Sequence, residues 1–287
     1  MRIHLVTYAA PRFRMRQLLL GASARLNHVV DTVTSWTPQK LLRADFEDRC
    51  KDIKLSERGS GFWAWKPFII AAKLHEIPDG DLIFYCDVGR RFPYKILDRP
   101  LAPFLEWMER NQQDFMPGLS IAWRGPLAVW TKRDAFVITG MDHPSAHTAP
   151  SVQASFSLWR AGPASRSFVR QWMTWCSDRR LVSDDPSTCG LPEYPGFHEH
   201  RHDQSLLTLT CLKTAAKALK IGDEPLPVDT RDPAQVIGYL FNMGPTAPSR
   251  CWKPFVAGVR LLERAEMLLR KTVKFGTDMP EHPLAND

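Results

Sequence analysis

The stretch that decides the fold of this chain reads Asp79-Gly80-Asp81-Leu82-Ile83-Phe84-Tyr85-Cys86-Asp87-Val88-Gly89. Its opening Asp-Gly pair is a turn signal, because glycine accepts a positive φ and aspartate bonds local backbone. The apolar run Leu82 to Cys86 then predicts a strand buried on both faces, as in the parallel sheet of an α/β protein. Ligands collect at the carboxyl ends of such strands, which makes Asp87 a candidate functional residue, and Gly89 permits close approach. An isolated Asp-x-Gly triplet is more often only a strand-ending turn.

A block rich in glycine and tryptophan precedes this strand. It reads Arg58-Gly59-Ser60-Gly61-Phe62-Trp63-Ala64-Trp65-Lys66-Pro67. Proline suits the first turn of a helix, so Phe68 to Leu74 is predicted to be a buried helix that leads to the Asp-Gly turn.

The two segments together resemble a group of bacterial nucleotide-diphospho-sugar transferases found with capsule, O-antigen and other surface-polysaccharide genes. The shared pattern is Arg-Gly-x-Gly-[Phe/Tyr]-Trp-x-Trp-Lys-Pro, a helix, Asp-Gly-Asp, an apolar strand and Asp-x-Gly. A second block of the same group is matched by His202-Asp203-Gln204-Ser205-Leu206. The resemblance covers about Arg2 to Lys213. It implies a single GT-A-like (Rossmann-like) α/β domain with a mostly parallel central sheet flanked by helices.

The activity implied by the resemblance is transfer of a sugar from a nucleotide-diphosphate donor to a glycan acceptor, either a surface polysaccharide or a lipid-linked oligosaccharide. Asp203 and Gln204 are the implied catalytic pair, with Asp203 a general base in an inverting enzyme or a stabiliser of the sugar in a retaining one. The implied donor-binding residues are Thr7, Tyr8, Arg58, Trp65, Lys66, Asp87 and Gly89. Tyr8 ends the first expected strand, where it would either stack on the nucleotide base or pack the edge of the sheet.

The resemblance also implies a divalent cation, Mn²⁺ or Mg²⁺, on the donor diphosphate, because such ions prefer oxygen ligands. Asp87 is the expected ligand, and His202 is a further candidate. Enzymes of this kind commonly carry Asp-x-Asp, whereas this chain has Gly89 in the second place, which leaves the second ligand unassigned. Lys66, Arg90 and Arg91 are the alternative means of neutralising phosphate.

Composition fits an ordinary globular protein: 287 residues, 44% hydrophobic and 24% charged, enough for one α/β domain and a tail. The net charge of +7 suits a nucleotide diphosphate or an anionic membrane surface. The scattered cysteines form no Cys-x-x-Cys pair, which argues against a zinc ribbon and for a reducing compartment. No apolar run approaches the about 18 to 20 residues that cross a bilayer. We therefore expect a cytoplasmic protein, with peripheral contact to the inner face of the plasma membrane left open.

The remaining pattern predicts one catalytic domain over 1–244 and an amphipathic helix with a loose tail over 245–287. Expected strands and helices follow from apolar periodicity. The expected strands are Ile3 to Tyr8, His28 to Val33, pieces within Phe115 to Trp130, Gln153 to Trp159 and Ile221 to Val228. The expected helices are Arg14 to Leu26, Pro103 to Gln112, Lys132 to Met141, Ser165 to Leu181 and Ser205 to Leu219.

The tail helix, Val259 to Phe275, combines an apolar stripe with an excess of Arg and Lys. A helix of this kind either packs on the domain or lies in the interface of an anionic membrane.

Three other function classes compete. A non-catalytic carbohydrate-binding protein would stack sugars on Trp63, Trp65 and Trp123. A metal hydrolase would use the histidine-rich loop His198-x-His200-x-His202. A nucleic-acid partner is not expected, because no basic block with interleaved aromatics is present.

Overall fold

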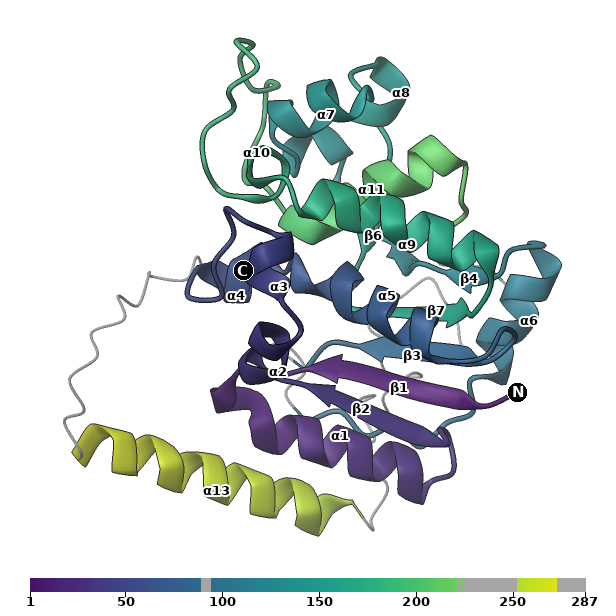
Figure 1. Cartoon of the computed structure of the whole chain (residues 1–287), viewed down its shortest axis with the longest axis vertical. Helices are drawn as coiled ribbons and strands as arrows, with labels where there is room; N and C mark the ends of the chain where they lie inside the picture. The colour runs from purple at the N-terminus through teal and green to yellow at the C-terminus, as the bar shows by residue number, and fades with distance from the viewer. Residues whose placement is uncertain (89–93, 221–222, 224–251, 273–287) are drawn as a thin grey trace.

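A five-stranded sheet organises the fold (Figure 1). The computed structural model describes residues 1–88, 94–220, 223 and 252–272. The sheet has the order β2-β1-β3-β7-β4, with β1 parallel to β2 and β3, and β7 antiparallel to β3 and β4. Four strands therefore run one way and β7 runs against them, as expected of a mostly parallel sheet in an α/β fold. The strands are β1 (Ile3–Tyr8), β2 (Thr32–Trp36), β3 (Leu82–Cys86), β4 (Phe115–Met116) and β7 (Phe156–Arg160), and a second small sheet pairs β5 (Leu119–Ser120) with β6 (Val152–Gln153).

Strand β3 is buried along its whole length because it lies at the centre of the sheet. Its side chains alternate between two apolar cores, with Ile83 and Tyr85 in one and Leu82, Phe84 and Cys86 in the other. A run that serves both faces must be apolar at every position, which explains the continuous pattern in the sequence.

Helices cover both faces of the sheet (Figure 1). On one face, α5 (Trp65–Glu76), α9 (Pro163–Cys176) and α11 (His202–Thr214) share a core with Ile83 and Tyr85. On the other face, α1 (Arg14–Leu26) and α6 (Ala102–Arg110) pack against Leu5 and Phe84. The shorter helices are α2 (Pro38–Arg43), α3 (Phe46–Arg49), α4 (Arg58–Phe62), α7 (Arg133–Thr139), α8 (Pro144–His147) and α10 (Arg179–Val182), with single 3₁₀ turns at Pro11–Phe13, Ala122–Arg124 and Leu127–Val129.

Strands β1 and β3 and helix α1 have the predicted bounds, and the helices predicted at Pro103 to Gln112 and Lys132 to Met141 form within two residues of them. The strand predicted at His28 to Val33 is wrong: β2 runs Thr32–Trp36. Strand β2 lies at the edge of the sheet and its side chains are only half-buried. Its sequence is therefore less apolar than the buried Val29 and Val30 that precede it, and those two residues drew the prediction toward themselves.

Three other predicted segments differ from the structure. The helix predicted over Ser165 to Leu181 stops at Cys176, and α10 restarts after Asp178, whose side chain accepts from the backbone N–H of Arg180. The predicted strand Gln153 to Trp159 divides into β6 and β7. The last predicted helix begins at His202 rather than Ser205 and ends at Thr214. The predicted strand Ile221 to Val228 (except Asp223) and the 244/245 boundary lie outside the described residues.

The C-terminal helix α13 (Lys253–Thr272) lies alongside α1 on the outer side of the molecule (Figure 1). The end of its predicted range, 273–275, lies outside the described residues. Among the residues that the structure describes, no helix is both long enough and apolar enough to cross a bilayer.

Candidate functional site

The carboxyl ends of β1 and β3 and the N-termini of α5 and α11 meet at one edge of the sheet, beside α4 (Figure 1). Asp87 follows β3, Lys66 lies in the first turn of α5, and Asp203 lies in the first turn of α11. The backbone of Asp87 is fixed by an N–H···O bond of 2.8 Å to Ser155. Three of the sequence-predicted residues are thereby brought together.

Lys66 is the centre of this cluster. Its Nζ lies 2.8 Å from Asp203 Oδ2, 3.4 Å from Asp87 Oδ1 and 3.0 Å from the carbonyl oxygen of Ala154. Lys66 and Asp203 are buried, whereas the Asp87 side chain is 29% exposed. A buried ammonium needs acceptors for its hydrogens, and here two carboxylates and a carbonyl supply them. The cluster opens to solvent through Asp87.

The electrostatics of the cluster favour a proton-transfer role for Asp203. Burial raises the pKa of Asp203 to about 6, Lys66 opposes the rise, and Asp87 adds to it. Burial also disfavours the ammonium of Lys66, but its two carboxylate neighbours more than offset this and hold its pKa above the ordinary value. One cation between two carboxylates leaves a net negative charge, which keeps Asp203 basic.

The two carboxylates are anchored by aromatic side chains from the core. The Tyr85 hydroxyl donates to Asp87 Oδ1, and burial followed by the charge of Asp87 raises the pKa of Tyr85 well above its ordinary value. Trp172 Nε1 donates to the backbone oxygen of Asp203 over 2.9 Å. Apart from the ammonium of Lys66, Asp203 Oδ2 has no hydrogen-bond partner among the described residues. That oxygen is therefore buried and held by Lys66 alone among the described residues.

The glycine- and tryptophan-rich block forms a left-handed turn. Every residue from Gly59 to Trp63 has a positive φ, between 53° and 85°. This conformation costs a non-glycine residue roughly 1 to 2 kcal/mol, and Ser60, Phe62 and Trp63 all adopt it. Strain of this kind persists only where the surroundings enforce it, and it is concentrated at functional sites. The turn delivers the chain to Trp65 and Lys66.

Tyr8 and Trp65 stack on each other, with ring centroids 4.0 Å apart, and both are buried. Trp65 Nε1 also donates to the carbonyl of Gly59 over 2.9 Å. Thr7 is fully buried, and its hydroxyl has no partner among the described residues. The Tyr8 ring, which is predicted to stack on a nucleotide base, therefore has Trp65 as a stacking partner within the protein.

His202 lies beside the cluster and is held neutral. Its Nδ1 bonds the carbonyl oxygen of Val182 at 2.9 Å, and its Nε2 lies 3.5 Å from Asp184 Oδ1. Burial lowers the pKa of His202 to about 4, although Asp184 opposes the shift. The ring also packs against Phe62 and Trp63 of the left-handed turn.

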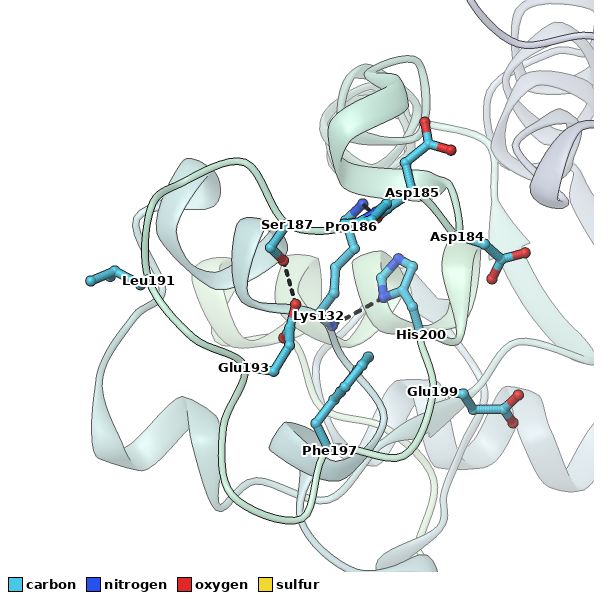
Figure 2. Close-up of a pocket in the computed structure, with 10 residues that line it drawn as sticks. All are labelled: Lys132, Asp184, Asp185, Pro186, Ser187, Leu191, Glu193, Phe197, Glu199 and His200. Atoms are coloured by element: carbon cyan, nitrogen blue, oxygen red, sulfur yellow. Dashed lines mark hydrogen bonds between the residues drawn. The ribbon is translucent and has the colours of Figure 1, made fainter.

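A pocket of about 430 Å³ adjoins this region (Figure 2). Lys132 and His200 lie at its centre, and the side chains of Asp184 and Glu199 point to the same side. Those two carboxylates contact Arg58, at 3.2 Å and 3.8 Å. Arg58 therefore joins the pocket wall to the left-handed turn. Lys66, Asp87 and Asp203 do not line the pocket.

The described residues do not fit a divalent cation held between Asp87 and Asp203, because the ammonium of Lys66 occupies that position. No group of three or more His, Cys, Asp or Glu side chains is placed to hold a metal ion within the described part of the chain. The histidine-rich loop does not converge on one ion either. His200 has both ring nitrogens bonded, to Lys132 N and Leu181 O, and the His198 ring lies edge-on against Trp130.

Several residues of the site had no signal in the sequence. Tyr85 read only as part of a buried strand, and Trp172 only as core. Asp184 lies between predicted elements, in a segment rich in Pro, Asp and Ser, and no pattern singles it out. Gln204 is half-buried at the start of α11. Gly89, Arg90 and Arg91 lie outside the described residues.

The geometry thus presents a buried carboxylate, with a pKa raised by burial, paired with a lysine at the carboxyl edge of the sheet. In comparisons with known proteins, no protein-family model and no curated protein matches this chain.

Proposed function

We propose that this chain is a glycosyltransferase that moves a sugar from a nucleotide-diphosphate donor to a glycan acceptor. The observation that carries the proposal is the Lys66 ion pair with Asp203 beside Asp87, at the carboxyl ends of parallel strands. Open α/β sheets bind ligands at that edge, and the residues come from the two blocks that resemble nucleotide-diphospho-sugar transferases. A GT-A-like topology is part of the same proposal.

Asp203 has the properties of a general base. Its pKa of about 6 leaves it ionised at neutral pH yet basic enough to accept the proton of an acceptor hydroxyl. Its Oδ2 is engaged only by Lys66 among the described residues. In an inverting enzyme the Asp203 carboxylate takes the proton as the hydroxyl attacks the sugar and the bond from the sugar to the nucleoside diphosphate breaks. In a retaining enzyme the same negative charge stabilises the oxocarbenium-like sugar.

Lys66 acts as a positioning residue. Its three acceptors are all protein groups, so it fixes both carboxylates rather than gripping a diphosphate directly. Asp87, the exposed member of the cluster, faces the donor. A divalent cation, Mn²⁺ or Mg²⁺, remains a separate proposal for the donor diphosphate, with Asp87 as the side chain that would meet it.

The proposal is tested by a thermal-shift screen of nucleotide sugars, with and without Mn²⁺. A donor at 100 times its Kd stabilises the folded chain by about 2.7 kcal/mol through mass action. Positive donors then enter a turnover assay that measures release of nucleoside diphosphate, with Asp203→Asn as the matched inactive control. If no nucleotide sugar shifts the melting temperature under either condition, the proposal is wrong.

The carbohydrate-binding alternative is less well supported by the structure. Trp65 is buried and Trp63 packs on His202, so Trp123 is the exposed ring of the three proposed for sugar stacking. Binding of a donor without any turnover would favour this alternative.

A further inference from the structure

Helix α13 has one face that is fully engaged with the rest of the protein. Val256 and Val259 share a small core with Leu19 of α1 and Ile96. Glu263 accepts from Arg16, with Nε 2.6 Å from Oε1, and from the Tyr94 hydroxyl at 2.8 Å. These contacts fix the helix on α1 and define which of its faces points outward.

Beside and opposite this engaged face, α13 exposes apolar side chains. Leu261 is 65% exposed, Leu262 is 54% exposed and Phe255 is exposed to a similar degree. Successive residues turn by about 100° on a helix, so Phe255 and Leu262 share one line and Leu261 and Ala265 share the next. We call this set, with Ala257, the outer face of α13.

Exposed cations border the outer face. Lys253, Arg260 and Arg264 are all exposed, and the Arg260 guanidinium lies 4.9 Å from the centre of the Tyr94 ring. The carboxylate of Glu263 is turned inward onto Arg16. Among the side chains of α13 that the structure describes, the exposed charged ones, Lys253, Arg260 and Arg264, are therefore all positive.

Helix α1, on which α13 packs, also exposes apolar side chains. Leu18 and Leu26 are exposed and lie two helical turns apart on one side of α1. Leu18 is the direct neighbour of Leu19, which packs on α13. Exposed apolar side chains are therefore present on the supporting helix as well as on the outer face of α13.

We propose that the outer face of α13 docks on the surface of an anionic lipid bilayer. An interfacial helix buries an apolar face about 5 to 10 Å into the boundary between headgroups and acyl chains, with Lys and Arg along its polar side. The negative potential of anionic lipids attracts cations that lie near the surface. A second copy of this chain fits less well, because a two-fold contact places the same patch on both partners and brings like charges together. This surface lies outside the proposed catalytic cluster and does not depend on its chemistry.

Flotation of the full-length protein with lipid vesicles tests the proposal. We expect it to float with phosphatidylglycerol vesicles at low salt, and to remain at the bottom with phosphatidylcholine vesicles. Arg264→Glu removes one cation and adds one anion, so at about 1 kcal/mol for each charge it should lower the membrane partition coefficient by roughly 30-fold. Leu262→Glu should lower it by at least about tenfold, because it places a carboxylate on the apolar face that enters the interface. Salt should reverse binding of the parent protein.

Matched controls separate this surface from a general effect of charge. Leu42→Glu changes a leucine that is 52% exposed on α2, and Arg170→Glu changes an exposed arginine on α9. Both should float as the parent does, and far-UV circular dichroism should show that all four variants are folded.

Failure of the parent to float with anionic vesicles overturns the proposal. So does flotation that Leu262→Glu and Arg264→Glu leave unchanged. A stable dimer in light scattering that Leu262→Glu dissociates would assign the face to a second copy instead.

Discussion

Lys66 Nζ lies 2.8 Å from Asp203 Oδ2, joining the first turn of α5 to the first turn of α11 inside the protein. The positive end of a helix dipole favours a carboxylate and disfavours an ammonium. The dipole of α11 therefore stabilises the Asp203 carboxylate. The dipole of α5 disfavours the Lys66 ammonium, and the two carboxylates around Lys66 offset this cost. The pair ties two helices to one chemical centre, and the predictions below test what each member does.

Asp203→Asn should reduce turnover by roughly 10²- to 10⁴-fold, the usual contribution of a general acid or base. Nucleoside diphosphate affinity should be nearly unchanged, because Asp203 is proposed to act at the sugar. The parent kcat/KM should rise with pH through about 6, where Asp203 loses its proton. Steady-state kinetics and nucleotide titration check both parts. Equal loss of nucleotide affinity would place Asp203 at the diphosphate instead.

Asp203 should also make stability depend on pH in a defined direction. Its folded pKa of about 6 lies above its ordinary 3.8, so the folded state binds more protons between these values. Stability should therefore fall, on the order of 1 to 3 kcal/mol, as pH rises from about 4 to about 6. Lys66 has a raised pKa and stays charged across that window, so it adds no slope. Urea unfolding of the parent and Asp203→Asn should differ in this slope, and parallel curves would contradict the assignment.

Asp87→Asn should keep the fold and lose most turnover. An asparagine oxygen can still accept from the Tyr85 hydroxyl, so the change removes the exposed negative charge and little else. Turnover with saturating Mn²⁺ and the melting temperature are the measurements. Asp48→Asn, at an exposed aspartate outside the cluster, should behave as the parent does. Parental turnover in Asp87→Asn would remove Asp87 from the donor site.

Lys66→Met should destabilise the chain by about 3 to 5 kcal/mol, because it leaves buried Asp203 without its cation. Adding Asp203→Asn removes the unpaired charge, so the double variant should be more stable than Lys66→Met alone. Urea unfolding of the four proteins in this cycle gives the coupling. Additive losses would show that the two residues do not act as a pair.

The sequence predicted the elements whose pattern is local and strong. Strand β3 was found because every residue from Leu82 to Cys86 is apolar, and the helix predicted from Ser205 forms, although it begins at His202 and so includes Asp203 in its first turn. Edge strand β2 was misplaced because half-buried Thr and Ser positions carry little apolar signal.

The features that could not be predicted from the sequence depend mostly on contacts between distant segments. Nothing near Lys66 or Asp203 reveals that they pair, and nothing near Tyr8 reveals that it stacks on Trp65. The break at Asp178 depends on one side-chain cap that competes with an otherwise helical pattern. The left-handed turn was visible only as two glycines, since its remaining positions are residues that rarely adopt a positive φ.

Gly59→Ala should disrupt the left-handed turn, and Gly80→Ala provides a matched control. Both glycines have a positive φ, 62° and 88°, so alanine at either costs roughly 1 kcal/mol in backbone strain. A Cβ at Gly59 would also lie 2.5 Å from the Trp63 ring, whereas one at Gly80 meets nothing within 4 Å. Gly59→Ala must therefore move Trp63, which packs on His202, and disturb the bond from Trp65 to the Gly59 carbonyl. We expect Gly59→Ala to lose more stability than Gly80→Ala and, at a temperature where both are folded, to lose turnover that Gly80→Ala retains. Equal activity in the two variants would show that the turn supports the fold but does not position the site.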